Sequence, residues 1–293
     1  MGQSEFDACY RELFGDRWPE LRAALTAPRR FGARANPFEP TGAAALRSLP
    51  GAREIAGLKD CFESESPFEP PERGPAGLLG AYLLDAASVV AAEALGVQAG
   101  EDVLDLCAAP GGKALVLARA CADGGSLTAN DRSAARRARL ARVLDDHLPP
   151  GVRERVRVTG HDATRWSLHE RDAYDRILLD APCSSEQHVL ADPRALREWS
   201  PARSRQLARR QYAMLASALD VVRVGGCIVY ATCALAPAEN DGIIARLLAD
   251  GRRAGRARAL EPSGPFGEAT EHGWAILPDR TGWGPMWFAR TSG

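Results

Sequence analysis

The 293-residue chain is long enough for one large domain, or for one domain with a smaller attachment. Its hydrophobic content of 45% and charged content of 26% are those of an ordinary soluble globular protein. Its formal net charge of −1 excludes a general polycation, so any contact with nucleic acid must come from local patches of charge.

Seven cysteines are an odd number and are scattered without a C-x-x-C pair, so neither a disulfide framework nor a zinc site is expected. His161, His169 and His188 lack the spacing of metal ligands, and no metal is expected. The first residues include acids but no apolar run, which predicts neither a signal peptide nor a transit peptide. No apolar run reaches about 18 residues, so we expect a cytoplasmic protein without a membrane span.

The first quarter of the chain predicts a small unit separate from the rest. Residues 1–25 have the periodicity of two short amphipathic helices, and Gly and Pro then interrupt the pattern. Residues 54–72 are acid-rich and end in a proline-rich run, which is typical of a linker. We therefore expect a helical N-terminal extension with an acidic linker over residues 1–73, followed by a second domain over residues 74–293.

The second domain begins with a mostly apolar segment and continues with a regular alternation. Residues 77–95 are rich in helix formers and are followed by Gly96, which predicts a buried helix. Short apolar strands then alternate with helices, which favours an α/β fold with a doubly wound, mostly parallel sheet. The strands are predicted at 101–107, 126–131, 155–160, 175–180 and 226–232, and the helices at 111–122, 133–148, 203–222 and 238–250. Two apolar runs around a glycine-rich turn in residues 274–290 predict a closing antiparallel hairpin.

Two cysteines occupy chemically informative places in this pattern. Ligands of an open parallel sheet bind beyond the carboxyl ends of its strands, near the point where strand order reverses. Cys183 and Cys233 each follow a predicted strand, so both are expected at the same edge of the sheet. A buried cysteine often serves only as a small apolar side chain, and this remains the alternative for Cys233.

A small-residue turn over residues 105–113 leads from a strand into a helix. Its glycines let backbone amides approach a ligand, and the helix N-terminus favours a negative group such as a carboxylate. The turn is neither G-x-G-x-x-G nor a P-loop, so a nucleoside carrying a carboxylate fits it better than a dinucleotide. Asp131 follows the next strand and could accept hydrogen bonds from a ribose, or could cap the following helix.

Four motifs in this order resemble those of the Sun family of S-adenosylmethionine-dependent RNA (cytosine-5) methyltransferases. They are DLCAAPGGK, LLDAPCSS, YATCALAPAEND and ILPDRTGWGPMWFAR, and the similarity covers about residues 81–290. The segment YLLDAASVVAAEALG and the GPM near the end are most similar to the mitochondrial small-subunit rRNA branch, which lacks a PUA domain. The resemblance implies a Rossmann-like class I methyltransferase that binds S-adenosylmethionine, releases S-adenosylhomocysteine and acts on RNA, with rRNA as the expected substrate.

The resemblance also implies the catalytic residues. Cys233 would attack carbon 6 of cytosine, which makes carbon 5 nucleophilic, and Cys183 would help to release the methylated product. Asp180 would face the amino group and ring nitrogen of the base, unless it serves only as a cap or in a salt bridge. Lys113 would lower the pKa of the attacking thiol, unless its role is structural.

The resemblance to the Sun family also implies a set of cofactor contacts. Asp131 and Arg136 would hold the ribose and its surroundings, Asp162 the adenine, and Asp180 would also lie beside the cofactor. Arg136 could instead be a solvated helix charge, and Asp162 could cap a turn. The methionine part would be held by backbone groups of Cys107, Ala108, Ala109, Pro110, Gly111, Gly112 and Lys113.

RNA contacts and competing functions remain open at this point. Arginines are crowded in residues 132–142, 203–210 and 252–258, where they could bind phosphates or form solvated faces. The target cytosine must leave any base stack, which favours a single-stranded or loop site. The alternatives are tRNA as substrate, a non-enzymatic ribosome assembly or RNA-binding factor, and a DNA cytosine methyltransferase in which Cys183 attacks; the Thr232-Cys233 pair argues against the last of these.

Overall fold

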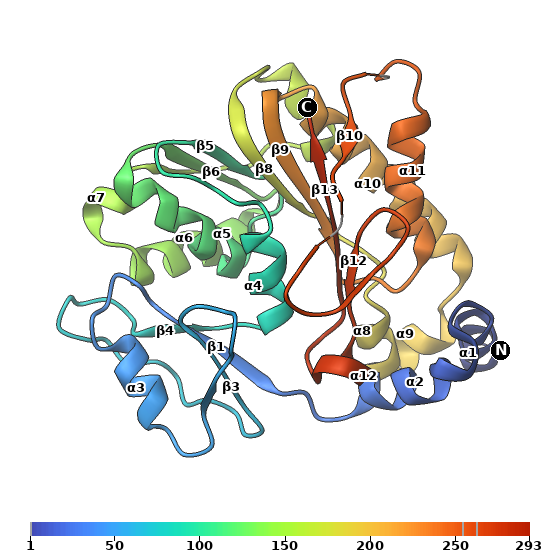
Figure 1. Cartoon of the computed structure of the whole chain (residues 1–293), viewed down its shortest axis with the longest axis horizontal. Coiled ribbons are helices and arrows are strands. Elements are labelled where there is room, and N and C mark those ends of the chain that lie inside the picture. Colours follow the sequence, from blue (N-terminus) through green and yellow to red (C-terminus); the bar gives the residue numbers. More distant parts are fainter. Residues whose placement is uncertain (1, 254, 262) are drawn as a thin grey trace.

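A twisted nine-stranded sheet occupies the centre of the described part of the chain (Figure 1). The computed structural model describes residues 2–253, 255–261 and 263–293. The strands run in the order β11-β12-β13-β9-β8-β5-β6-β7, and β10 pairs with β13 beside this path. The bounds are β5 (Asp102–Asp105), β6 (Ser126–Asn130), β7 (Val156–Thr159), β8 (Tyr174–Asp180), β9 (Val222–Thr232), β10 (Arg258–Ala259), β11 (Glu268–Ala269), β12 (Trp274–Ile276) and β13 (Met286–Ser292).

The strands from β9 to β7 are parallel, and the end of the chain reverses direction. β13 is antiparallel to β9, and β12 is antiparallel to β13. The short helix α12 (Pro278–Thr281) connects β12 to β13, so the predicted closing hairpin is confirmed. Since β6 and β8 flank β5 on opposite sides, strand order reverses at β5, where an open α/β sheet binds its ligand.

Helices cover both faces of this sheet, which confirms the predicted doubly wound α/β fold. One core contains α4 (Ala86–Glu93), α5 (Gly112–Ala118) and α6 (Ala134–His147), and the other contains α10 (Pro201–Leu219) and α11 (Asp241–Ala249). Neighbouring strand residues alternate between the two cores: Leu178 packs in the first and Leu179 in the second. Shorter helical segments are η2 (Arg119–Asp123), α7 (Pro150–Arg153), η3 (Ala163–Leu168) and η4 (Pro237–Glu239). Within the described ranges, no helix has both the length and the apolar character needed to cross a membrane.

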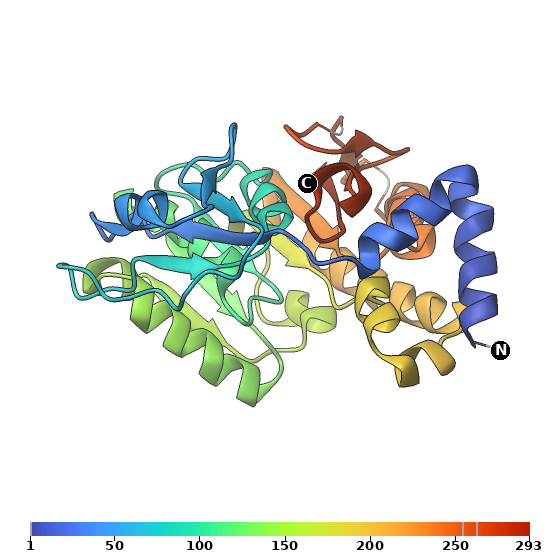
Figure 2. The same cartoon turned by 90° about the horizontal axis from the view of Figure 1, so that it is seen from below.

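The two predicted N-terminal helices are present and pack beside the second core (Figure 2). They are α1 (Gly2–Phe14) and α2 (Trp18–Thr26), joined by the short η1 (Gly15–Arg17). Their buried rings contact the segment that contains α8 (Glu186–Ala191) and α9 (Pro193–Arg197), as the 5.0 Å separation between the ring centroids of Phe6 and Trp199 shows. The helices therefore bury their apolar faces against the large sheet domain.

Residues 31–83 contain a small antiparallel sheet that the sequence pattern did not reveal. Its order is β2-β3-β1-β4, and α3 packs beside it. The bounds are β1 (Phe31–Ala35), α3 (Gly42–Ser48), β2 (Arg53–Glu54), β3 (Cys61–Ser64) and β4 (Ala81–Leu83). The prediction of a linker is therefore wrong for residues 54–64, because the buried side chains of Cys61 and Phe62 are supported by pairing with β1. β4 joins the same sheet from beyond residue 73, so the proposed boundary there divides a paired sheet.

The single long helix predicted over residues 77–95 is wrong in its first half. Only α4 is helical, and β4 precedes it. Asp85 has an extended backbone, with ψ of 135°, and its side chain accepts a hydrogen bond from the amide of Ala87 at 2.9 Å. This N-cap begins the helix late, and the pairing of β4 with β1 holds the preceding residues in an extended conformation.

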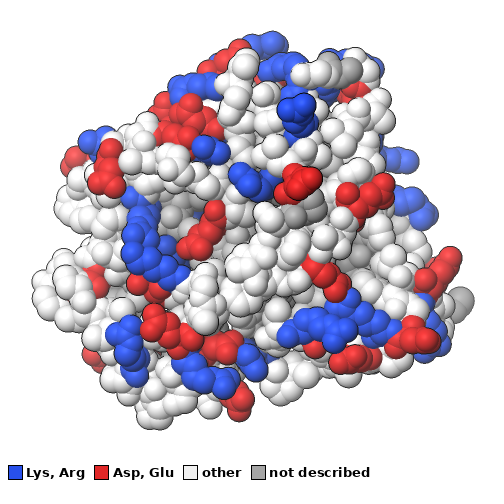
Figure 3. Space-filling model, viewed as in Figure 1, with Lys and Arg blue, Asp and Glu red and all other residues white. Residues whose placement is uncertain are grey.

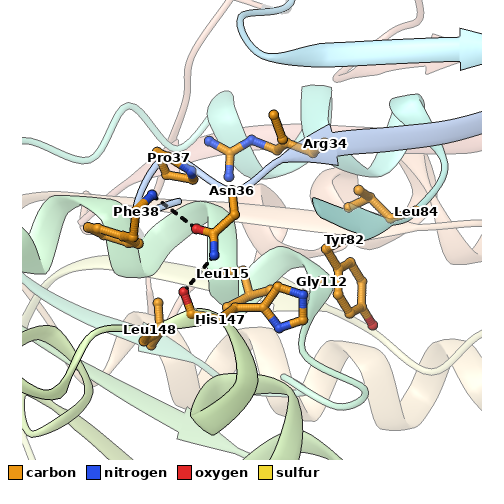
Figure 4. A pocket seen from close by; sticks show the side chains of 11 residues that line it. Arg34, Asn36, Pro37, Phe38, Tyr82, Leu84, Gly112, Leu115, His147 and Leu148 are labelled. Atoms are coloured by element: carbon orange, nitrogen blue, oxygen red, sulfur yellow. Dashed lines mark hydrogen bonds between the residues drawn. The ribbon is translucent and has the colours of Figure 1, made fainter. Parts of the chain in front are cut away.

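The small sheet is fastened over α5 and α6 (Figure 4). The Asn36 side-chain amide donates to the carbonyls of His147 and Leu79, each at 2.9 Å. A cavity of ≈ 20 Å³ remains between these elements, and Tyr82 lies on its wall beside Gly112. A Cβ atom at Gly112 would lie 2.8 Å from the Tyr82 ring, so the glycine permits this close approach.

Asp85 joins two distant parts of the chain, and its loss is expected to be costly. Besides capping α4, its carboxylate accepts the amide of Gly284 in the closing hairpin at 2.7 Å. Asp85→Ala should lower the free energy of unfolding by about 2 kcal/mol, about 1 for the cap and about 1 for the second bond, as measured by urea unfolding.

Asp192 provides the matched control, because it caps α9 through the amide of Arg194 in an exposed position. Asp192→Ala should cost about 1 kcal/mol or less. Equal losses in the two variants would contradict a bridging role for Asp85.

Candidate active site

The glycine turn between β5 and α5 forms one wall of a cavity at the carboxyl edge of the sheet. The cavity measures ≈ 240 Å³, and its lining includes predicted turn residues from Cys107 to Lys113, except for Gly111. Gly111 instead makes the turn, with φ of +124°, and a Cβ atom there would lie 2.8 Å from the Val143 side chain. The turn therefore borders an open space at the start of a helix, and binding of a cofactor by its backbone groups remains a prediction.

A second active-site cavity, of ≈ 500 Å³, lies next to the first one, which the glycine turn borders. Cys107 lines both of these cavities. Asp131 and Arg136 line it together, with Arg136 Nη1 3.3 Å from Asp131 Oδ2. Arg136 also donates to the carbonyl of Ala109 in the glycine turn, so it is not merely a solvated helix charge. The N-cap of α6 is Ser133 rather than Asp131. Asp131 Oδ1 accepts from the Ser133 amide at 2.9 Å, and Asp131 Oδ2 faces the arginine.

Asp162 has the local role that the sequence left open. It caps η3, since Oδ1 accepts from the Thr164 amide at 3.0 Å and from the Thr164 hydroxyl at 2.9 Å. Burial raises its pKa, but these hydrogen bonds and the nearby Arg132 lower it more, so the net shift is downward. Its neighbours His161 and Ala163 line the second cavity, and any contact between Asp162 and an adenine remains a prediction.

The two strand-end cysteines meet directly. Their Sγ atoms are 3.1 Å apart, one from the loop after β8 and the other from the loop after β9. Ser185, which the sequence analysis did not single out, places its hydroxyl 3.0 Å from Cys233 Sγ and 3.4 Å from Cys183 Sγ. Its backbone is left-handed, with φ of +54°, and this turn brings the hydroxyl back toward the thiols.

The surroundings distinguish the two thiols. The pKa of Cys233 is lowered, first by the hydrogen bond from Cys183 and then by Ser185 and Lys113, although burial and Asp180 oppose the shift. The pKa of Cys183 is raised by the same hydrogen bond, by burial and by the charge of the Cys233 thiolate. Cys233 is therefore the thiol that ionises first, and only a thiolate is a good nucleophile.

Lys113 and Asp180 form a partly buried ion pair next to the thiols. Lys113 Nζ lies 2.9 Å from Asp180 Oδ2 and donates to the Ser88 hydroxyl at 3.0 Å. Burial would lower the pKa of Lys113, but the neighbouring Asp180 carboxylate and Cys233 raise it more, so the ammonium stays charged. Both residues line the first cavity, so the salt bridge also places their charges beside any ligand bound there.

Asp105 is a further candidate that the sequence analysis missed. It is 1% exposed and lines the first cavity, where Oδ1 accepts from the Cys107 amide and Oδ2 has no hydrogen-bond partner. Burial, and then repulsion from Asp180, raise its pKa to about 7. A buried carboxylate oxygen without a partner is costly, and a ligand ammonium would satisfy it. Its position at the end of β5 was the available signal.

The sheet order, the glycine turn and the two joined cavities define a Rossmann-like class I methyltransferase fold. Solved structures agree with this class. A methyltransferase homolog from Pyrococcus horikoshii aligns with a TM-score of 0.76 and 24% identity, over 97% of this chain and 92% of that one. NSun6 from the same organism, solved with SFG, aligns with a TM-score of 0.79 and 18% identity, over 98% and 97%.

Sequence comparisons narrow the class to a family. Residues 92–291 match the family model described as 16S rRNA methyltransferase RsmB/F, and the chain belongs to this family. A Bos taurus relative, 5-cytosine rRNA methyltransferase NSUN4, is 36% identical over 83% of this chain and 73% of its own length. A mitochondrial tRNA (cytosine(34)-C(5))-methyltransferase from Danio rerio is 34% identical over 83% and 71%. The predicted resemblance to the Sun family is confirmed.

The thiol contact generates a measurable prediction. Cys183→Ala removes the largest influence that lowers the pKa of Cys233, so alkylation of Cys233 by iodoacetamide should require a higher pH. Lys113→Gln should shift the alkylation profile in the same direction by a smaller amount. Mass spectrometry of the Cys233 peptide over a pH series gives both profiles, and an unchanged profile in Cys183→Ala would rule out the proposed activation.

Proposed function

We propose that the chain transfers a methyl group from S-adenosylmethionine to carbon 5 of a cytosine in RNA, through a covalent adduct on Cys233. The observation that carries this proposal is the 3.1 Å contact between two thiols with opposite pKa shifts, next to the Lys113–Asp180 pair. Family membership and the names of the rRNA and tRNA relatives support the reaction class.

The residues that line the two joined cavities suit S-adenosylmethionine in their chemistry. The first offers the unpartnered Asp105 oxygen for the ammonium and backbone groups of the glycine turn for the carboxylate. The second offers Asp131 for the ribose hydroxyls. The use of SFG, an S-adenosylmethionine analogue, with the Pyrococcus NSun6 supports this assignment. When bound, the cofactor supplies an electrophilic methyl group attached to a positively charged sulfur.

The residues of this chain prepare the cytosine to accept that methyl group. The Cys233 thiolate adds to carbon 6 of the ring, which increases the electron density on carbon 5. Asp180, oriented by Lys113, faces the amino group and ring nitrogen of the base and stabilises charge that develops there. Once carbon 5 carries the methyl group, a water molecule takes its remaining proton, and the bond between carbon 6 and Cys233 breaks with its electron pair returning to the sulfur. The ring is then aromatic again. Cys183, still protonated and in contact with Cys233, assists this departure.

We infer that local patches of charge contact the RNA. Basic side chains on the face seen in Figure 3 form separate groups with acidic side chains between them. Several arginines of the predicted clusters are held in ion pairs, such as Arg132 with Asp162 and Arg253 with Asp250. Such a surface suits a short single-stranded or loop segment better than a long duplex, whose regularly spaced charge favours a continuous basic face. We propose rRNA as the substrate and retain tRNA as the second candidate, following the bovine and zebrafish relatives.

Removing each thiol separately tests the assignment of roles. Cys233→Ala should abolish transfer of tritium from labelled S-adenosylmethionine to RNA and should form no covalent adduct. Cys183→Ala should still attack, more slowly at neutral pH because the pKa of Cys233 is higher, but it should release the product more slowly still, so a protein–RNA adduct should accumulate and be visible on a denaturing gel. The reverse pattern would assign the attack to Cys183, as in a DNA-type mechanism. If the wild-type protein transfers no methyl group to either rRNA or tRNA, the result would favour a non-enzymatic RNA-binding factor.

The raised pKa of Asp105 generates a second prediction. Since this pKa is about 7, the carboxylate is neutral at lower pH and charged at higher pH. Affinity for S-adenosylhomocysteine, which retains the ammonium group, should therefore increase as the pH rises through about 7. Calorimetric titration of wild type and Asp105→Asn measures this, and the variant should bind more weakly with a flatter pH dependence. Equal pH profiles in the two proteins would remove Asp105 from the cofactor site.

A further inference from the structure

Two fully buried glutamates lie behind the cysteine pair, and the proposed reaction does not use either of them. Glu186 follows Cys183 at the start of α8, and Glu239 follows Cys233 at the end of η4. Both side chains are 0% exposed. A buried carboxylate is expensive unless neighbouring groups hydrogen-bond to it, so its partners show what it holds in place.

Each glutamate is bonded to the backbone of the other cysteine's loop. Glu186 Oε2 accepts from the amide of Leu235 at 2.8 Å, two residues beyond Cys233. Glu239 Oε2 accepts from the amide of Ser184 at 3.0 Å, the residue after Cys183. We call these two reciprocal hydrogen bonds the cross-loop clasp. Because each bond spans the two loops, the clasp opposes any change in the distance between them.

Two neighbouring helices reinforce the clasp. Gln211 of α10 donates from one nitrogen to Glu239 Oε2 at 2.8 Å and to the carbonyl of Pro182 at 2.9 Å. Tyr10 of α1 donates its hydroxyl to Glu186 Oε1 at 2.7 Å. Tyr10 is 2% exposed, and its ring packs against Trp18 and Trp199, so α1 holds the hydroxyl in a defined position.

We propose that Glu186 and Glu239 are positioning residues that set the separation of the Cys183 and Cys233 sulfurs, and that Tyr10 couples the N-terminal helices to this separation. The catalytic consequence rests on the proposed function, because both thiols must meet one cytosine. The geometric consequence does not, because it concerns only the two loops. Without the clasp, the buried amides of Ser184 and Leu235 would lose their hydrogen-bond acceptors. Because unpartnered buried amides are costly, the loops would tend to move apart.

The rate at which a trivalent arsenical bridges the two thiols depends on the distance between their sulfurs, and measuring it does not require catalysis. Phenylarsine oxide reacts with two adjacent thiols, forming two arsenic–sulfur bonds while its oxygen leaves with both protons as water. The rate of capture by the full chain is measured, and capture that persists in Cys233→Ser is subtracted, so that only the Cys183–Cys233 pair is followed.

Tyr10→Phe is the informative variant, because it removes one hydroxyl and keeps the aromatic packing. It should slow arsenical capture about fivefold, the effect expected of one buried hydrogen bond. Glu239→Met, which has nearly the same length but no oxygen to accept the Ser184 amide, should slow capture by at least as much. Both variants should also lower kcat for methyl transfer while leaving the KM for S-adenosylmethionine unchanged.

Tyr212→Phe is the matched control. It also removes a hydrogen bond between a tyrosine and a carboxylate, to Asp250 at the far end of α11, and should capture the arsenical at the wild-type rate. Thermal unfolding of each variant shows whether it is folded. If Glu239→Met does not fold, the capture rate of Tyr10→Phe alone decides the test.

The possible outcomes separate this inference from the proposed function. Wild-type capture rates in both Tyr10→Phe and Glu239→Met would overturn the clasp, even if the protein methylates RNA. Slower capture in both variants would support it, even if no RNA is methylated and the proposed function fails.

Discussion

Parallel pairing of β8 with β9 is the constraint on which the rest of the site depends. Their register sets Leu179 opposite Tyr230 and Asp180 opposite Ala231. The two strands therefore end at the same level, and each continues directly into a cysteine loop. With strands about 4.8 Å apart in a sheet, a shift of one residue would move the thiols out of contact and turn Asp180 to the other face.

Burial makes this geometry chemically useful. Two equivalent thiols in water would ionise alike, whereas here the shared hydrogen bond lowers the pKa of Cys233 and raises that of Cys183. The Lys113–Asp180 pair adds two opposite charges within the same enclosed space, where electrostatic interactions are stronger than in water. One short contact thus produces an attacking group and a protonated neighbour from the same residue type.

The N-terminal elements contribute to the site from two sides. The small sheet places Tyr82 against Gly112, so it covers the glycine turn of the first cavity. On the other side, Tyr10 of α1 reaches Glu186 behind the cysteine loop. Both contacts involve residues from the first third of the chain, so this part of the chain belongs to the architecture of the site.

The sequence by itself determined the alternating α/β pattern, the closing hairpin, the two N-terminal helices and the position of both cysteines at strand ends. These features are local, since hydrophobic periodicity and turn residues specify each element within a few neighbouring positions. Only the tertiary structure decided that residues 54–64 belong to a small sheet through β2 and β3 in place of a linker, because Cys61 and Phe62 depend on a distant partner strand. It alone decided the opposite pKa shifts of the two thiols, the unpartnered oxygen of Asp105 and the crossed bonds of Glu186 and Glu239. Those properties arise from burial and from contacts between residues far apart in the chain, which no local pattern records.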